Sequence, residues 1–139
     1  MTWVIIVLLV IAILGKFFWD YSKDNDDLNY QPLHEKFGVI VEMINQEAFN
    51  GLGTISKFDK REFNLYQDMQ NQIIKFQYGT GNLTITWRYK YFQKEVVHER
   101  QFNNVRNLSL FEQQNIGEQI INEMIYVIEK HKINVLKNI

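Results

Sequence analysis

The N-terminal segment, residues 1–19, is apolar enough to constrain the fold of the entire chain. Residues 2–15 carry no charged side chain and consist mainly of valine, isoleucine and leucine. A helix needs about 20 predominantly apolar residues to cross a bilayer, with a lower limit of about 17. Residues 3–19 meet that requirement at its short end. The sequence therefore predicts a transmembrane anchor in residues 1–19, followed by a domain that folds in water.

Aromatic and basic side chains stand near both edges of the anchor. Aromatic rings are enriched at the two membrane–water interfaces, and a lysine near the end of a helix can extend its ammonium to the headgroups. Lys16 and Lys23 lie toward the C-terminal edge, which places the domain in the cytoplasm by the positive-inside rule. The residues predicted to hold the anchor in the bilayer are Trp3, Lys16, Phe17, Phe18 and Trp19.

A cleaved signal peptide is the main alternative to an uncleaved signal-anchor. Such a peptide begins with basic residues and ends with small residues at the cleavage site. Here no lysine or arginine precedes Lys16, and Ile13 stands two residues before Gly15, where a small residue is needed. A helix buried in a soluble core would carry a polar stripe, which this segment lacks. We therefore expect a single-pass membrane protein whose anchor is retained.

Composition limits what the remainder of the chain can be. With 139 residues in total, there is room for the anchor and one domain of ordinary size. The net charge of −1 gives no electrostatic signal for nucleic acid. The absence of cysteine excludes disulfides and thiolate metal ligands. We therefore expect no nucleic-acid partner, no metal and no cofactor.

Residues 20–31 are polar, acidic and aperiodic, which predicts a short stalk between the anchor and the domain. Asp24, Asp26 and Asp27 are spaced somewhat like the first ligands of a calcium loop. Such a loop also needs a glycine at its sixth position, and Asn29 stands there instead. The acidic cluster is therefore interpreted as part of a solvated linker.

A first amphipathic helix is predicted over residues 32–49. Pro32 suits the first helical turn, because the N–H that proline lacks would have no intrahelical partner there. Apolar side chains then recur every three or four residues, and Asn50 and Gly51 end the pattern. The residues predicted to be buried are Leu33, Phe37, Ile40, Val41, Ile44 and Ala48.

Residues 57–102 alternate between apolar and polar side chains and predict a four-stranded antiparallel meander. Gly79 and Gly81 suit a hairpin turn within it. Pairing Tyr78 with Leu83 across that turn brings the apolar side chains of both strands to one face, so the register is consistent. It also pairs Ile74 with Trp87, and an earlier strand joins by pairing Phe63 with Phe76. The residues predicted to face the core are Leu83, Ile85, Trp87 and Tyr89, and those predicted to face solvent are Thr84, Thr86, Arg88 and Lys90.

The last strand can pair with the strand before it in more than one register. A two-residue turn at residues 93–94 sets Trp87 opposite Arg100 and Arg88 opposite Glu99. The second pair is attractive, whereas a shift by one residue would oppose two arginines. The sequence therefore favours the first register.

This register places His98 and Arg100 on the same face as Trp87 and Tyr89. One interpretation is a pocket, in which an arginine over a tryptophan and a histidine beside a tyrosine bind an anionic ligand. The other is that inward-pointing charge on an edge strand prevents association with a second sheet. Both interpretations stay open at the level of the sequence.

Ser109 and Glu112 form a capping-box pattern at the start of a second amphipathic helix, predicted over residues 110–132. Gly117 within this helix suggests close approach to a neighbouring element. An antiparallel sheet flanked in sequence by two amphipathic helices predicts an α+β fold, with both helices on one face of the sheet. The soluble domain would cover residues 32–139.

Patterns typical of enzymes are lacking in the sequence. His34, His98 and His131 do not have the spacing of a metal site, and the chain contains no nucleophile elbow or phosphate-binding loop. We therefore expect a non-catalytic interaction module, an accessory or scaffold subunit of a membrane complex that binds a protein partner or a second copy. The residues predicted to contact a partner or anionic headgroups are Thr84, Thr86, Arg88 and Lys90. The alternative is a ligand-binding or sensing domain with a pocket formed by Trp87, Tyr89, His98 and Arg100.

Overall fold

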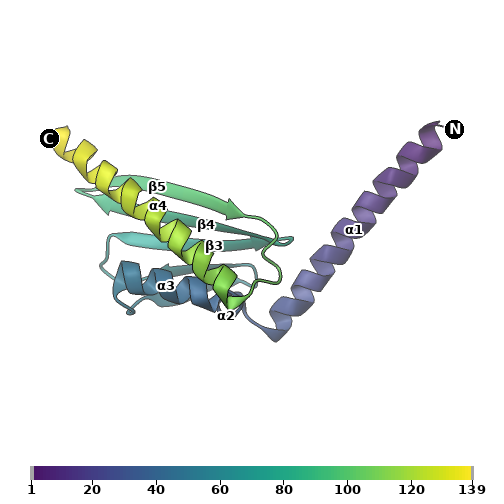
Figure 1. Ribbon diagram of the computed structural model, residues 1–139, viewed down its shortest axis with the longest axis horizontal. Coiled ribbons are helices and arrows are strands. Elements are labelled where there is room, and N and C mark those ends of the chain that lie inside the picture. Colours follow the sequence, from purple (N-terminus) through teal and green to yellow (C-terminus); the bar gives the residue numbers. More distant parts are fainter. Residues whose placement is uncertain (1, 139) are drawn as a thin grey trace.

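The computed structural model describes residues 2–138, including all of their side chains except those of residues 24, 27 and 30. The chain is an α+β protein with a long N-terminal helix, a five-stranded antiparallel sheet and a long C-terminal helix (Figure 1). The helices are α1 (Thr2–Tyr30), α2 (Leu33–Lys36), α3 (Gly38–Phe49) and α4 (Leu110–Lys137). The strands are β1 (Thr54–Asp59), β2 (Glu62–Tyr66), β3 (Gln72–Gly79), β4 (Asn82–Tyr91) and β5 (Lys94–Phe102).

The sheet is a simple meander in which the strands lie in the order β1-β2-β3-β4-β5. The prediction of four strands was wrong, because β1 precedes the strands that the alternation revealed. In β1 only Ile55 is partly buried, while the other residues of the strand are exposed. An edge strand with one inward side chain shows no alternation of apolar and polar residues, so the sequence carried no signal for it.

The predicted registers of the three central strands are confirmed. Across the β3–β4 hairpin, Tyr78 pairs with Leu83 and Ile74 pairs with Trp87. Between β2 and β3, Phe63 pairs with Phe76, and their rings stack with centroids 4.6 Å apart. Because the side-chain period of a strand is two, one correct pair places every apolar side chain of these strands on the same face.

The predicted register of the last hairpin was wrong by two residues. The turn is formed by Phe92 and Gln93, at φ 48° and 62°, and Trp87 lies opposite His98 instead of Arg100. Two consecutive residues at positive φ are typical of a type I′ turn, whose twist matches that of the flanking strands. The prediction relied on a cross-strand charge pair, which contributes less than about 1 kcal/mol. A shift of two residues leaves each side chain on its predicted face.

Two helices differ from their predicted bounds. The helix predicted over residues 32–49 is interrupted at Phe37, whose φ of −105° and ψ of 33° separate α2 from α3. The C-terminal helix continues beyond residue 132 to Lys137. Its predicted start is confirmed, since the Ser109 hydroxyl accepts a hydrogen bond from the Glu112 N–H at 3.1 Å. A Cβ atom at Gly117 would lie 2.6 Å from the Met43 sulfur, so this glycine allows α3 and α4 to approach closely.

Helices α3 and α4 lie side by side over one face of the sheet (Figure 1). The core lies between the helices and this face, as the amphipathic pattern of both helices and the alternation of the strands predict. The largest fully buried side chains are Trp87, Phe37, Phe63, Phe76, Ile40, Ile44, Leu65, Ile74, Leu83, Ile85, Ile120 and Met124.

The segment predicted as a stalk, residues 20–31, is almost entirely helical, because α1 continues without interruption to Tyr30. Leu28 is 5% exposed and belongs to the core of the domain, so the end of α1 packs against the folded part of the chain. The side chains of Asp24 and Asp27, from the cluster that lacked the features of a calcium loop, lie outside the described part of the structure. By length and composition, Thr2–Lys23 is suited to cross a membrane, and none of its most apolar window is buried.

Candidate functional site

The face of the sheet opposite α3 and α4 carries no helix in the part of the chain that the structure describes (Figure 1). We call it the open face. Thr84, Arg88 and Lys90 lie on it at least partly exposed, as the alternation predicted. Thr86 is on the same face but only 6% exposed, since its neighbours cover it and its hydroxyl donates to Glu99 at 2.7 Å. Residues of the open face on strands β2, β3 and β5 are Glu62, Asn64, Tyr66, Ile73, Lys75, Gln77, Glu95, Val97, Glu99 and Gln101.

A row of mainly apolar contacts crosses four strands of the open face. Tyr66 pairs with Ile73, Ile73 with Arg88, and Arg88 with Val97. Val97 is 47% exposed, and Tyr66 and Ile73 are partly buried. The aliphatic stem of Arg88 lies between apolar neighbours while its guanidinium extends toward water, as long cationic side chains commonly do. The row therefore combines an aromatic ring, two aliphatic side chains and a cation.

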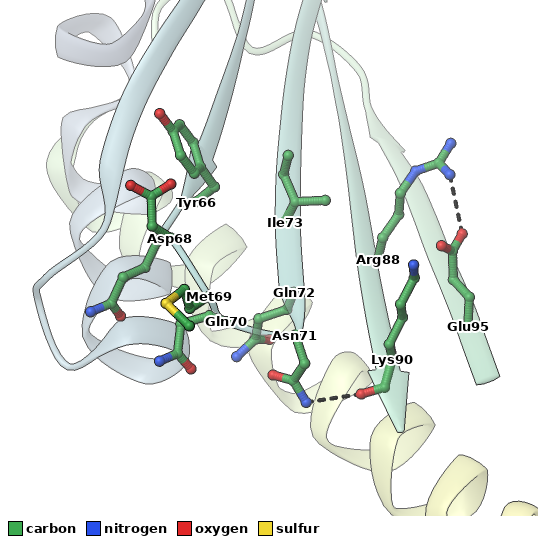
Figure 2. Close-up of a pocket in the computed structure, with 11 residues that line it drawn as sticks. Tyr66, Asp68, Met69, Gln70, Asn71, Gln72, Ile73, Arg88, Lys90 and Glu95 are labelled. Atoms are coloured by element: carbon green, nitrogen blue, oxygen red, sulfur yellow. Dashed lines mark hydrogen bonds and ion pairs between the residues drawn. The ribbon is translucent and has the colours of Figure 1, made fainter. Parts of the chain in front are cut away.

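A shallow hollow of about 310 Å³ lies at one end of this row (Figure 2). Its floor includes Tyr66 and Ile73, and one wall is the loop between β2 and β3, residues 67–71. Figure 2 shows Arg88 and Lys90 on β4 beside Glu95 on β5 along the other wall. Alternation located Arg88 and Lys90, but the hollow depends on the loop of residues 67–71, about which the sequence led to no prediction.

The loop that borders the hollow is held at one side and exposed at its tip. The amide of Asn71 donates to the Lys90 carbonyl at 2.9 Å, and the Lys90 N–H donates to the Asn71 carbonyl at 2.8 Å. Met69 at the tip is fully exposed and has a φ of 65°. A residue other than glycine rarely adopts positive φ, and an exposed methionine adapts readily to different partners. The hollow therefore has a fixed base and an adaptable apolar rim.

Charged side chains of both signs lie on the open face. Arg88 forms an ion pair with Glu95 at 3.1 Å, and Glu62 accepts a hydrogen bond from Gln77 at 2.6 Å. Within the described residues, no group of three or more His, Cys, Asp or Glu side chains is placed to hold a metal ion. The open face therefore combines an apolar row with charged and polar side chains.

Two residues of the alternative pocket belong to the core. Trp87 is 2% exposed, and its indole N–H donates to the Gln72 side chain at 2.9 Å. Gln72 in turn donates to the Ala48 carbonyl of α3 at 2.9 Å. Tyr89 is 7% exposed and has its ring edge-on to His131, with centroids 6.5 Å apart. Both rings therefore serve the packing of the sheet against the helices.

The other two residues of the alternative pocket are paired with the C-terminal helix. His98 lies 2.9 Å from one carboxylate oxygen of Glu123, and Arg100 forms an ion pair with the other. In its better orientation, the Gln119 side-chain oxygen also accepts hydrogen bonds from Arg100 at 2.8 and 2.9 Å. The carboxylate of Glu123 therefore occupies the place that an anionic ligand was expected to take. Sequence reasoning missed Glu123 because it lies in α4, far along the chain.

Replacing Glu123 with glutamine is expected to lower the free energy of unfolding by about 1–2 kcal/mol, because Arg100 loses its ion-pair partner and His98 loses a carboxylate as its hydrogen-bond partner. The side chain of Glu123 is 27% exposed, so solvent weakens but does not cancel the interaction. Urea unfolding followed by circular dichroism would measure the change. Glu118→Gln, at an exposed position of the same helix, is the matched control and should change stability little. Equal effects of the two substitutions would contradict a stabilising role for Glu123.

The predicted anchor residues lie along α1 and point into solvent in the isolated chain. Trp3 is 79% exposed and Trp19 is 73% exposed, while Phe17 and Phe18 lie between half and two-thirds exposed. Lys16 is exposed as well. Such a band of exposed apolar surface is not stable in water, since its burial elsewhere is favourable by about 25 cal/mol per Å².

No protein-family model, no curated protein and no solved structure matches this chain.

Proposed function

We propose that this protein is a non-catalytic, single-pass membrane protein whose domain binds a protein partner through the open face of its sheet. In this role it is an accessory or scaffold subunit of a membrane complex. The observation that carries the proposal is the combination of an N-terminal helix whose apolar window is not buried with a folded domain that leaves one face of its sheet uncovered. The apolar window of the helix needs an apolar environment, which a bilayer supplies, and the hollow on the open face is accessible to a protein partner.

The proposed occupant of α1 is the bilayer. The apolar window of this helix is not buried by any other described part of the chain, which is unlike a core helix. The segment also lacks the basic start and the small residues that a cleaved signal peptide uses. Lys16 and Lys23 favour a cytoplasmic position for the domain. We therefore propose an uncleaved anchor with the domain on the cytoplasmic side.

The proposed occupant of the open face is a protein. Tyrosine and arginine are enriched among residues that dominate binding energies, and Tyr66 and Arg88 lie next to the hollow. Val97, Ile73 and Met69 add apolar surface around them. The ion pair between Arg88 and Glu95 can exchange for contacts with a partner, since both side chains are partly exposed. This arrangement suits a partner with an apolar residue for the hollow and polar groups at its rim.

The double substitution Arg88→Glu and Lys90→Glu is expected to remove the partner. It removes the arginine next to the hollow and reverses two charges that a partner fitted to this face would meet, and a charge mismatch across an interface costs several kcal/mol. Native mass measurement after detergent extraction should show wild-type protein in complex with a partner or a second copy, and the variant alone. A thermal melt would verify that the variant is folded.

The matched control is Lys130→Glu with Lys137→Glu, which makes the same charge change on exposed positions of α4. This control should keep the partner. If wild-type protein extracted from its membrane is strictly monomeric and carries no other chain, the proposed function is wrong. If the control loses the partner as readily as the open-face variant does, the contact lies elsewhere.

A further inference from the structure

One end of the sheet lies beside α1, and three connections meet there (Figure 1). They are the β1–β2 turn, with Lys60 and Arg61, the β3–β4 turn, and the loop of residues 103–109 between β5 and α4. We call this region the anchor-side end. The Val105 N–H donates to the Gly81 carbonyl at 2.9 Å, so the loop and the β3–β4 turn form one surface.

Arg61 joins the anchor-side end to α1. Its guanidinium donates to the Tyr21 carbonyl at 3.2 Å and to the Asn25 side-chain oxygen at 2.8 Å. The same group lies 4.3 Å from the centre of the Tyr21 ring and donates to the Tyr78 carbonyl of β3 at 3.5 Å. Nearby, Lys60 donates to Asn29 and Leu28 enters the core. Several independent contacts thus fix the direction in which α1 leaves the domain.

These contacts also fix the distance between the domain and the bilayer that α1 is proposed to enter. At about 1.5 Å per residue along a helix, Tyr21 lies about 3 Å beyond Trp19 and Asn25 about 9 Å beyond it. The headgroup layer on each side of a bilayer is about 5–7 Å thick. If Trp19 marks the edge of the hydrocarbon, the guanidinium of Arg61 lies at the level of the headgroups.

The chemistry of the anchor-side end suits that level. Residues 79–82 and 103–109 contain no aspartate or glutamate, and most of their polar side chains are amides and hydroxyls, while in the β1–β2 turn Lys60 and Arg61 stand between Asp59 and Glu62. Amides, hydroxyls and guanidinium groups donate hydrogen bonds to phosphate oxygens. Among the described groups, the acceptors that Arg61 contacts through its side chain are neutral, so its positive charge remains available to an anion.

We propose that the anchor-side end of the domain lies against the phosphate headgroups of the bilayer, with Arg61 as the positioning residue. This inference rests on the proposed anchor in α1. It gives the domain a fixed orientation, in which the loop with Met69 is directed away from the membrane. Strand β3 connects the two ends, and its eight residues span about 25 Å. The open face is therefore held where a partner can reach the hollow from the water.

Single nitroxide labels test this orientation, and the chain is well suited to them because it contains no cysteine. The full-length variants Leu9→Cys, Thr80→Cys and Met69→Cys place one label in the anchor, at the anchor-side end and at the far end. Each is reconstituted in nanodiscs of equal parts phosphatidylcholine and phosphatidylglycerol. The measurement is the collision rate of each label with oxygen, which concentrates in the hydrocarbon, and with a water-soluble nickel chelate.

The label at Leu9 should collide mainly with oxygen and the label at Met69 mainly with the chelate. The label at Thr80 should give intermediate values, with chelate collisions reduced severalfold relative to Met69. If Thr80 and Met69 are equally accessible to the chelate while Leu9 is protected, the orientation is wrong and the anchor stands. If Leu9 is also accessible to the chelate, the anchor itself is wrong and the inference fails with it.

A second substitution tests the role of Arg61. In the Thr80→Cys background, Arg61→Gln should raise the chelate accessibility of the label toward the Met69 value, because the link between α1 and the sheet is weakened. Lys130→Gln, which removes one positive charge at an exposed position of α4, is the control and should leave the Thr80 label unchanged. An unchanged label in the Arg61→Gln variant would overturn the assignment of Arg61 as the positioning residue.

Discussion

Replacing Leu8 and Leu9 together with arginine is expected to release the protein from membranes. Both side chains lie inside the apolar window of α1 and are about 60% exposed in the isolated chain. An arginine near the middle of a membrane-spanning helix costs about 2.5–3.5 kcal/mol, and each lost leucine removes roughly 0.5 kcal/mol of favourable insertion energy. The pair therefore opposes insertion by about 6–8 kcal/mol in total, which is enough to reverse the partition of a marginally long helix.

Carbonate extraction of membranes followed by intact mass measurement would check this prediction. Wild-type protein should stay in the membrane pellet with residues 1–19 still attached. The control Leu8→Ile with Leu9→Ile keeps the hydrophobicity and should behave as the wild type does. A double-arginine variant that resists extraction would show that α1 does not span the bilayer, and a mature protein without its first residues would establish cleavage.

Replacing Trp87 with alanine is expected to lower the free energy of unfolding by about 3–5 kcal/mol, which is the usual cost of removing a large buried aromatic side chain. Trp87 is 2% exposed and lies in the central part of the core. Its indole N–H also donates a hydrogen bond to the side-chain oxygen of Gln72. The side-chain amide of Gln72 in turn donates to the Ala48 carbonyl near the end of α3. The substitution therefore leaves a cavity and removes a donor at the same place.

Urea unfolding of the full chain in detergent, followed by far-ultraviolet circular dichroism, would measure this loss. Trp87→Phe keeps most of the ring volume and should cost less than half as much. Arg88→Ala, the next residue but on the open face, should cost no more than about 1 kcal/mol, as is usual for an exposed ion pair. A Trp87→Ala variant as stable as Arg88→Ala would contradict the position of Trp87 in the core.

The central part of the sheet was predictable because two local signals agree there. Gly79 and Gly81 define the turn between β3 and β4, and the alternation of apolar side chains on both sides selects a single register. The β4–β5 hairpin lacked this agreement. Phe92 and Gln93 adopt positive φ although neither is a residue that usually does so, and a shift of two residues leaves the alternation unchanged.

The extent of α1 was not predictable from local sequence. Aspartate and asparagine have low helix propensity, so residues 20–31 indicated a linker. In the structure this part of the helix is stabilised by contacts with the domain, in which Leu28 is buried and Arg61 binds Tyr21 and Asn25. Tertiary contacts of this kind routinely override propensity. The segment predicted as a short acidic stalk is therefore a continuous helical connection.

The only part of the candidate site that could be predicted was the set of β4 residues that the alternation of apolar and polar side chains places on the open face. That pattern placed Thr84, Arg88 and Lys90 on the face away from the helices. It could not show that the β2–β3 loop borders a hollow beside Arg88, because the loop and β4 meet through long-range pairing. It also could not show that Thr86 is covered by its neighbours.

Sequence by itself determined the apolar window of α1, the direction of each side chain on the central strands and the start of α4. These features depend on composition and on the periods of helices and strands, which are local properties. Only the tertiary structure decided which side chains meet across elements. Glu123 pairs with His98 and Arg100, more than twenty positions earlier in the chain, because the rotation of α4 about its axis directs that carboxylate at β5. The rotation of a helix against a sheet is set by the packing of the whole core, and no short stretch of sequence contains it.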